Sequence, residues 1–404
     1  MEVKSFLKCK WVAHSFIAGV LVLLLLFASL PGCAPAAEEE IPPAEEEAPP
    51  AEEVGPYEEY VSSLPEGCEP VPRECFEQAQ REGQLNIYDW AEWWPEEIYT
   101  NFEKEFGIEI VRDNFADFDE MLAKFKLNPE TEYDYVLPDI RTFAQMQDLG
   151  LLQKLNHDWV PNVNKYLPEV TKGAWYDPGY QYGAASDIIP TAYSYNTKYV
   201  DDPRIPSWAV LFEPDEKYKG RISMINGMYE VVGCALKYLG YSINSDDEGE
   251  LMEVKELLLR QKPYVATYDS WPARSLREEE IWLAHQWYGD ALFLNRDVET
   301  LVPALPAEGS KAGVDTMIIP IGAKHPAAAH LWVNYLYRPR VNALMIETIC
   351  YLPNHTAAGE FLSLELREWL PPEEYWEICE YISPKAYTGK GLELRTEIWE
   401  ELKR

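Results

Sequence analysis

Three tryptophans and four acids crowd a short stretch of this 404-residue chain, where an apolar strand is expected to give way to a helix. The stretch has the sequence IYDWAEWWPEE at positions 87–97. Indole faces attract cations, and a nearby carboxylate supplies the charge that a desolvated cation needs. Trp90, Glu92 and Trp93 are therefore predicted to form part of a cup for an organic cation, whereas Trp94 is expected to be structural.

An alkyl polyammonium ion is one class of organic cation for which the needs of such a site can be stated. Its methylenes pack on flat aromatic walls, and its nitrogens require carboxylate partners once water is removed. Aromatic and acidic side chains on the loops that follow strands are the expected pattern for this ligand.

The composition limits the possible partners. The chain has 35 Lys and Arg against 69 Asp and Glu, which gives a formal net charge of −34. Nucleic acid and anionic lipid both need clustered basic residues, so neither is an expected partner.

The amino terminus predicts export from the cytoplasm. Three lysines precede an apolar run over positions 16–30, which is short for a membrane span, and LPGC follows. We interpret residues 1–32 as a signal peptide, and Cys33 resembles the lipidated cysteine of bacterial lipoproteins. The alternative is an uncleaved anchor, and both place the protein on the outer face of the cytoplasmic membrane.

Residues 33–83 begin with Glu, Pro and Ala repeats that offer little apolar surface, so this segment is predicted to be an extended acidic tether. Cys68 and Cys75 within it are a possible disulfide. The histidines and cysteines lack metal-ligand spacing, and the common hydrolase, metalloprotease and nucleotide motifs are absent. No metal and no cofactor are expected.

From residue 84 the chain alternates predicted strands and helices, which favours an α/β fold with a mostly parallel sheet and ligands at the carboxyl ends of strands. The segments in order are strand 85–88, a helix from Pro95 to Gly107, strand 108–111, helix 118–127, strand 133–137 and helix 142–149. Further on, we expect helices at 229–239, 327–337, 341–349 and 392–402, and strands at 281–287 and 315–320.

Several motifs, in order and nearly without gaps, resemble the periplasmic spermidine and putrescine binding proteins of polyamine ABC transporters. They are DWAEWWP (89–95), YDYVLPDIRTFAQMQDLGLLQKL (133–155), SWAVLFEPDEKYKGRISM (207–224), ALKYLGYSIN (235–244), WYGD (287–290), GVDTMIIPIGAK (313–324) and ETICYLPN (347–354).

The resemblance implies a two-lobed periplasmic-binding-protein fold of type II, with a discontinuous first lobe and crossing hinge strands. Lobe 1 would hold residues 84–190 and 316–355, and lobe 2 residues 191–315 and 356–404. The lobes would close on the ligand.

The same resemblance assigns binding roles beyond the first three residues. Asp315 matches a hinge aspartate that grips an amine, and Glu230 matches a second-lobe glutamate, although a helix N-terminal acid is its alternative role. Trp287 and Tyr351 match further ligand contacts of the family, and Asp139 stands where the family often has a serine near an amine, a place where an acid fits a cation better.

Departures from the family pattern leave the ligand open. Gly227 and Gly313 replace an acid and a tryptophan, and Arg141 replaces an aromatic residue. Arg141 would repel a polyamine, bind a ligand carboxylate bidentately, or pair with Asp139 as a structural bridge.

The predicted function is capture of a polyamine or related organic cation and delivery to an ABC permease with its ATPase, without catalysis and as a monomer. One alternative is a binding protein for an amino-acid-like zwitterion or other small solute, with Arg141 and Asp315 at its two ends. Another is a surface carbohydrate-active enzyme, because tryptophan platforms and paired carboxylates also serve glycoside cleavage.

Overall fold

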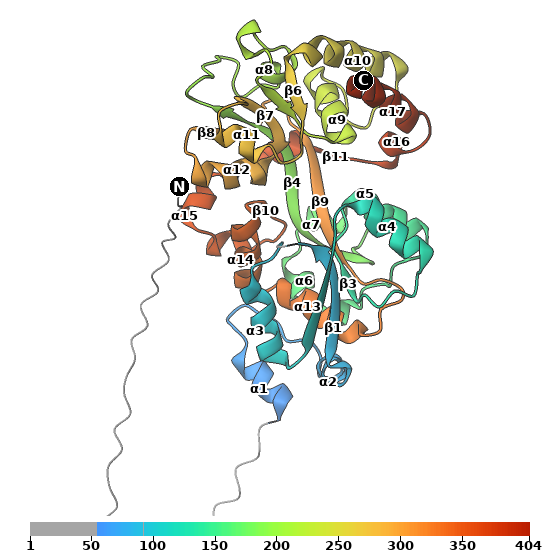
Figure 1. The fold of residues 1–404 in the computed structure, drawn as a ribbon. Helices are drawn as coiled ribbons and strands as arrows, with labels where there is room; N and C mark the ends of the chain where they lie inside the picture. Colours follow the sequence, from blue (N-terminus) through green and yellow to red (C-terminus); the bar gives the residue numbers. More distant parts are fainter. Residues whose placement is uncertain (1–54, 92) are drawn as a thin grey trace, which may run out of the picture. The chain divides into compact units, whose positions relative to one another are not determined.

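Two long strands, β4 (Gly183–Asn196) and β9 (Lys311–Ile318), lie antiparallel in the middle of one extended sheet. The structure is a computed structural model that describes residues 55–91 and 93–404. Figure 1 shows β4 and β9 joining the upper and lower groups of elements. The first half of β4 pairs with β9, and its second half pairs with β7 (Leu283–Trp287) and β8 (Leu301–Ala304).

The sheet order places parallel strands at both edges and antiparallel strands in the centre. The order is β2 (Glu109–Phe115), β1 (Gln84–Trp90), β3 (Tyr135–Val136), β9, β4, β7, β5 (Ile222–Met224) and β6 (Val265–Tyr268). β8 and β10 (Leu352–Pro353) pair with β4, and β11 (Glu380–Tyr381) pairs with β9.

Helices cover both groups of strands. Up to β4 they are α1 (Pro56–Ser63), α2 (Arg73–Glu82), α3 (Glu96–Phe106), α4 (Phe118–Leu127), α5 (Ile140–Asp148), α6 (Pro161–Tyr166) and α7 (Glu169–Lys172). After it they are α8 (Ala209–Phe212), α9 (Met228–Tyr238), α10 (Glu248–Gln261), α11 (Ala273–Arg277), α12 (Tyr288–Asp297), α13 (Pro326–Leu336), α14 (Pro339–Ile349), α15 (Leu364–Glu368), α16 (Pro384–Tyr387) and α17 (Gly389–Lys403). Short 3-10 turns lie at His157–Trp159, Glu216–Tyr218, Lys262–Tyr264, Ala358–Phe361 and Glu373–Ile378. In the described ranges no helix is long and apolar enough to span a membrane.

Two large hydrophobic clusters lie on different parts of this sheet, and each forms the core of one lobe. One surrounds β1 and β3 and contains Phe102, Phe125 and Trp332, all fully buried. The other surrounds β5 and contains Trp208 and Leu236. The carboxyl-terminal segment joins both, because Ile382 and Tyr387 pack in the first cluster and Ile398 and Leu402 in the second.

Local sequence signals explain where several elements begin. The helix predicted at 118–127 has those bounds, and the side chain of Asp117 caps it by accepting a 2.7 Å hydrogen bond from the Glu120 amide. Pro95 is the residue before α3 rather than its first residue, and Gly107 ends that helix in the left-handed conformation. The strand expected at 315–320 instead begins at Lys311.

The predicted tether extends too far along the chain. Residues 55–83 contain α1 and α2, whose Tyr60 and Phe76 are buried in the first cluster with ring centroids 5.0 Å apart. Glu82 at the end of α2 accepts hydrogen bonds from the amides of Ala327 and Ala328 at the start of α13. Acidic residues here cap and cover a folded lobe, so composition alone gave the wrong boundary. The signal peptide, Cys33 and residues 33–54 lie outside the described part.

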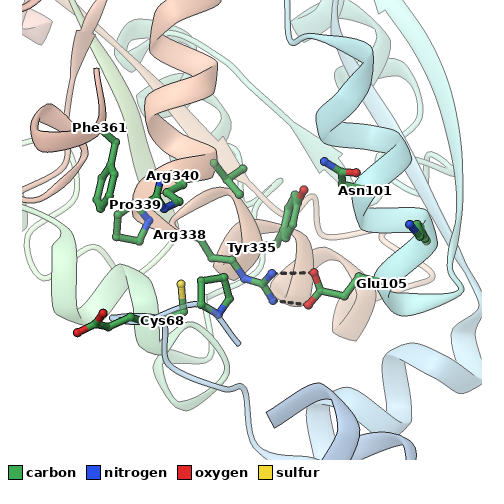
Figure 2. A pocket seen from close by; sticks show the side chains of 12 residues that line it. Cys68, Asn101, Glu105, Tyr335, Arg338, Pro339, Arg340 and Phe361 are labelled. Carbon is green, nitrogen blue, oxygen red and sulfur yellow. Dashed lines mark hydrogen bonds and ion pairs between the residues drawn. The ribbon is translucent and has the colours of Figure 1, made fainter. Parts of the chain in front are cut away.

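The possible disulfide between Cys68 and Cys75 is not formed, because both residues are free thiols. Cys75 is buried on the face of α2 that packs against α13, where its Sγ donates toward the Ala327 carbonyl. Cys68 instead lines a surface groove of about 390 Å³ with Arg338, as Figure 2 shows. Cys75 is therefore a core residue, whereas Cys68 lies at the surface groove.

Candidate functional site

A cavity of about 480 Å³ lies where the ends of several strands meet the crossing strand β9. Trp90 ends β1, Trp287 ends β7, and Asp315 lies in β9. The residues that line the cavity are Trp90, Trp93, Phe118, Asp139, Ile140, Ile189, Glu230, Ser270, Trp271, Trp287, Asp290, Lys311, Gly313, Asp315, Tyr351 and Ile382. The structure thus brings together the predicted site residues except Glu92, Arg141 and the cysteines.

One wall of the cavity is aromatic. The Trp90 ring lies 5.0 Å from that of Phe118 and 6.3 Å from that of Trp93, and Trp93 lies 5.7 Å from Tyr351. Trp94 is only 3% exposed and packs in the core, which confirms its expected structural role. Glu92 lies outside the described residues, so its predicted role stays a prediction.

A glycine allows Tyr351 to reach this wall. A Cβ atom added to Gly289 would lie 1.9 Å from the Tyr351 ring, so only glycine permits this approach. The Tyr351 hydroxyl donates a 3.1 Å hydrogen bond to Oδ1 of Asp290, one residue further along α12. Within the WYGD motif, Trp287 therefore supplies a ring to the cavity, Gly289 leaves space for Tyr351, and Asp290 accepts the hydrogen bond of the Tyr351 hydroxyl.

Buried carboxylates gather around Asp315, which is 4% exposed. Its backbone forms a bridge with Asp139 and pairs with Asp187 on β4. Both Asp187 oxygens and one Asp89 oxygen are buried and lack a hydrogen-bond partner in the described ranges. Such groups cost free energy unless a cation or proton compensates them.

The pKa values of these acids record this cost. Burial raises the pKa of Asp89 to about 8 and that of Asp187 to about 7. Burial, with the charges of Asp187 and Asp139, raises the pKa of Asp315 well above its ordinary value. Burial also raises the pKa of Asp290 to about 7. We call Asp89, Asp139, Asp187, Asp290 and Asp315 the acid cluster. The raised pKa values of Asp89, Asp187, Asp290 and Asp315 are typical of a site that binds a cation.

Glu230 has different surroundings. It lies in the first turn of α9, and its Oε1 is 2.9 Å from Nζ of Lys311 on β9. Burial opposes ionisation of Glu230, but the Lys311 ammonium outweighs burial and lowers the pKa of the carboxyl. Glu230 is thus an ionised acid that already holds a cation.

Arg141 lies outside the cavity lining. Its guanidinium is 3.3 Å from Oδ1 of Asp119 and 3.8 Å from Oδ2 of Asp139, and it lies over the Tyr229 ring. Asp139 also caps α5 by accepting a 2.9 Å hydrogen bond from the Thr142 amide. This arrangement matches the structural-bridge alternative for Arg141.

Sequence reasoning missed Lys311, Asp290 and Trp271 as lining residues. Lys311 precedes Gly313 and Asp315 at a spacing of two, so strand alternation could have placed all three on one face. Trp271 lies on the loop that follows β6, and an aromatic residue near the end of a strand is also the signal that identified Trp90 in β1. Asp290 lay within a motif already singled out.

Comparisons with known proteins agree with this architecture. Residues 97–365 match the family of bacterial extracellular solute-binding proteins. The spermidine/putrescine-binding periplasmic protein of Salmonella typhimurium is 31% identical over 71% of this chain and 82% of its own length. The putrescine/cadaverine-binding protein of Pseudomonas aeruginosa is 28% identical over 72% of this chain and 84% of its own.

A solved structure supports the fold. The spermidine/putrescine ABC transporter substrate-binding protein of Streptococcus pneumoniae has a TM-score of 0.73 at 24% identity, over 79% of this chain and 98% of its own. The similarity confirms the predicted two-lobed type II fold. With the family match over well more than half of its length, this chain is a bacterial extracellular solute-binding protein.

Proposed function

We propose that the cavity binds a linear polyamine, such as putrescine or spermidine, and releases it unchanged. The observation that carries this proposal is that Asp139, Asp290 and Asp315 line the cavity together with tryptophans, and that buried Asp187 pairs with Asp315 on the neighbouring strand. Among the described residues, the one ion pair that these four acids make is the 3.8 Å contact of Asp139 with Arg141. An ammonium group would compensate these charges, and the methylenes would pack on the indole faces of Trp90, Trp93 and Trp287.

The names of the relatives point to the same ligand class. The Salmonella protein is a spermidine/putrescine-binding protein and the Pseudomonas protein a putrescine/cadaverine-binding protein. Both match this chain across most of their own length.

Capture would occur by lobe closure. Trp90 is the last residue of β1, a strand of the first hydrophobic cluster, whereas Glu230 belongs to α9, a helix of the second. A ligand that contacts residues of both lobes favours the closed state, because some of its contacts exist only there.

The delivery partner in this proposal is an ABC permease with a cytoplasmic ATPase. Residues 1–32 would serve as the signal peptide, and lipidated Cys33 would hold the monomer on the outer face of the cytoplasmic membrane. Glu92, beside Trp90 and Trp93 in the sequence, would add a carboxylate to the site.

Calorimetric titration of the purified protein tests the ligand class. The panel contains putrescine, cadaverine, spermidine, spermine, arginine, γ-aminobutyrate and a neutral disaccharide. We expect saturable binding and thermal stabilisation with polyamines only, without turnover. Stabilisation by a zwitterion or a sugar alone, or hydrolysis of a glycan, would overturn the proposal.

A further inference from the structure

One end of the cavity contains a cation that belongs to the protein. Lys311 and Glu230 form an ion pair of 2.9 Å, and their side chains are only 10% and 14% exposed. The lysine is itself a cavity-lining residue. Its ammonium group therefore stands in the place that a ligand amine would need in order to reach Glu230.

The strand geometry fixes this lysine at a distance from the acid cluster. Lys311, Gly313 and Asp315 line the cavity from alternate positions of β9, and Gly313 between them has no side chain. Four residues of extended strand separate the Cα atoms of Lys311 and Asp315 by about 13 Å. The cavity thus has an anionic end at Asp315 and an open middle at Gly313. At its other end, Lys311 already neutralises Glu230.

We propose that Lys311 is a specificity-determining residue that occupies Glu230 as an internal ammonium and makes the site select short diamines over spermidine. The inference rests on the proposed function of polyamine binding. A diamine places its ammonium groups among the carboxylates of the acid cluster. The additional aminoalkyl arm of spermidine must extend toward Lys311.

Both charge and space oppose that extra arm. Its ammonium would meet the like charge of Lys311 in a poorly hydrated site, and like charges repel more strongly there than in water. Glu230, the acid that lines this end of the cavity, is already paired with Lys311. Displacing Lys311 from Glu230 would leave one of two buried cations unpaired, which is costly.

Competitive titration of putrescine and spermidine on Lys311→Met tests the proposal. The wild-type protein is expected to bind putrescine more tightly, and the variant is expected to shift the affinity ratio at least tenfold toward spermidine. The matched control is Lys255→Met, which removes a 15% exposed lysine that pairs with Glu397 and Glu401 outside the cavity. This control is expected to leave the ratio unchanged.

The double variant Lys311→Met/Glu230→Gln covers the case in which the unpaired Glu230 destabilises the single variant. It removes both charges, so it should retain putrescine affinity and lose the gain in spermidine affinity. A wild-type protein that binds neither amine would refute polyamine binding itself. A wild-type preference for spermidine, or an unchanged ratio in Lys311→Met, would refute the role of Lys311 while leaving polyamine binding intact.

Discussion

The two ends of the cavity treat a buried carboxylate in opposite ways. At the acid cluster, Asp315 and Asp187 are buried together with raised pKa values. At the other end, Glu230 is also largely enclosed, with 14% of its side chain exposed, yet Lys311 keeps it ionised. Burial of an acid therefore does not by itself identify a ligand contact. A buried acid without an ion-pair partner among the described residues is the better candidate.

This difference also indicates where a cationic ligand would be stabilised most. Carboxylates that lack a cation destabilise the unliganded protein, whereas an internal ion pair is largely balanced. A cationic ligand would therefore recover most free energy at the acid cluster. Changes there should have the largest effects on binding.

Asp315→Asn is expected to have the largest effect. Loss of one partner in a buried charge pair costs about 2 kcal/mol or more, which is about a 30-fold rise in the dissociation constant for putrescine. The melting temperature of the unliganded variant should stay the same or increase, because a crowded charge is removed. Calorimetry and thermal unfolding measure the two quantities.

The matched control for that variant is Asp297→Asn, which removes an exposed acid that pairs with Arg277 on the surface. It should leave putrescine affinity unchanged. An Asp315→Asn protein that binds putrescine as tightly as wild type would show that the acid cluster is not the amine site.

The next largest effect is expected from pH. The folded pKa values of Asp89, Asp187 and Asp290 lie at about 7 to 8, above the unfolded value of about 3.9. Their bound protons therefore stabilise the unliganded fold at low pH, and this contribution is lost as pH rises through about 7 to 8. The ligand needs the ionised forms, so its binding should release protons and strengthen about tenfold from pH 6 to pH 8.

Calorimetry in two buffers of different ionisation enthalpy measures those released protons. Glu230 has a lowered pKa, so it stays ionised throughout this range. The double variant Lys311→Met/Glu230→Gln should consequently keep the same pH dependence. If the pH dependence of binding were lost in that variant, the titrating groups would lie at the end that contains Lys311 and Glu230, and not in the acid cluster.

The aromatic wall should contribute less than the acids. Trp287→Leu keeps apolar bulk but removes the indole face, and we expect a loss of about 1 kcal/mol, or about fivefold in putrescine affinity. Trp271 is 47% exposed, so Trp271→Leu should cost about twofold or less. The control is Trp175→Leu, another exposed tryptophan that does not line the cavity. Equal losses in all three variants would argue against stacking at Trp287.

Sequence reasoning found the fold and seven of the sixteen lining residues, because the alternation of strands and helices, the order of the motifs and the loop aromatics can all be read locally. The start of β9 was misplaced, since Lys311 and Ala312 do not resemble an apolar strand. Lys311 was missed for the same reason. Its partner Glu230 lies 81 positions away, and no local pattern encodes such a pair.

The length of the tether was overestimated for a related physical reason. Glu58 and Glu59 make α1 resemble the acidic segment before it, but Tyr60 is buried against Phe76. A single buried ring among several acids decides whether such a helix packs. Average composition does not resolve that difference.

Arg141→Ala is expected to have a small effect of opposite sign and separates a structural bridge from a ligand contact. The arginine attracts Asp139 from outside the lining, at 3.8 Å, while Asp119 on its other side is 82% exposed in its side chain. Removing it should make Asp139 more available to a ligand amine and strengthen putrescine binding about twofold, since partly exposed ion pairs contribute little. Calorimetry of Arg141→Ala beside Arg141→Lys measures this, because lysine keeps the charge. Weaker putrescine binding in the alanine variant, with recovery in the lysine variant, would mean that the positive charge supports the acid cluster rather than competing with the ligand.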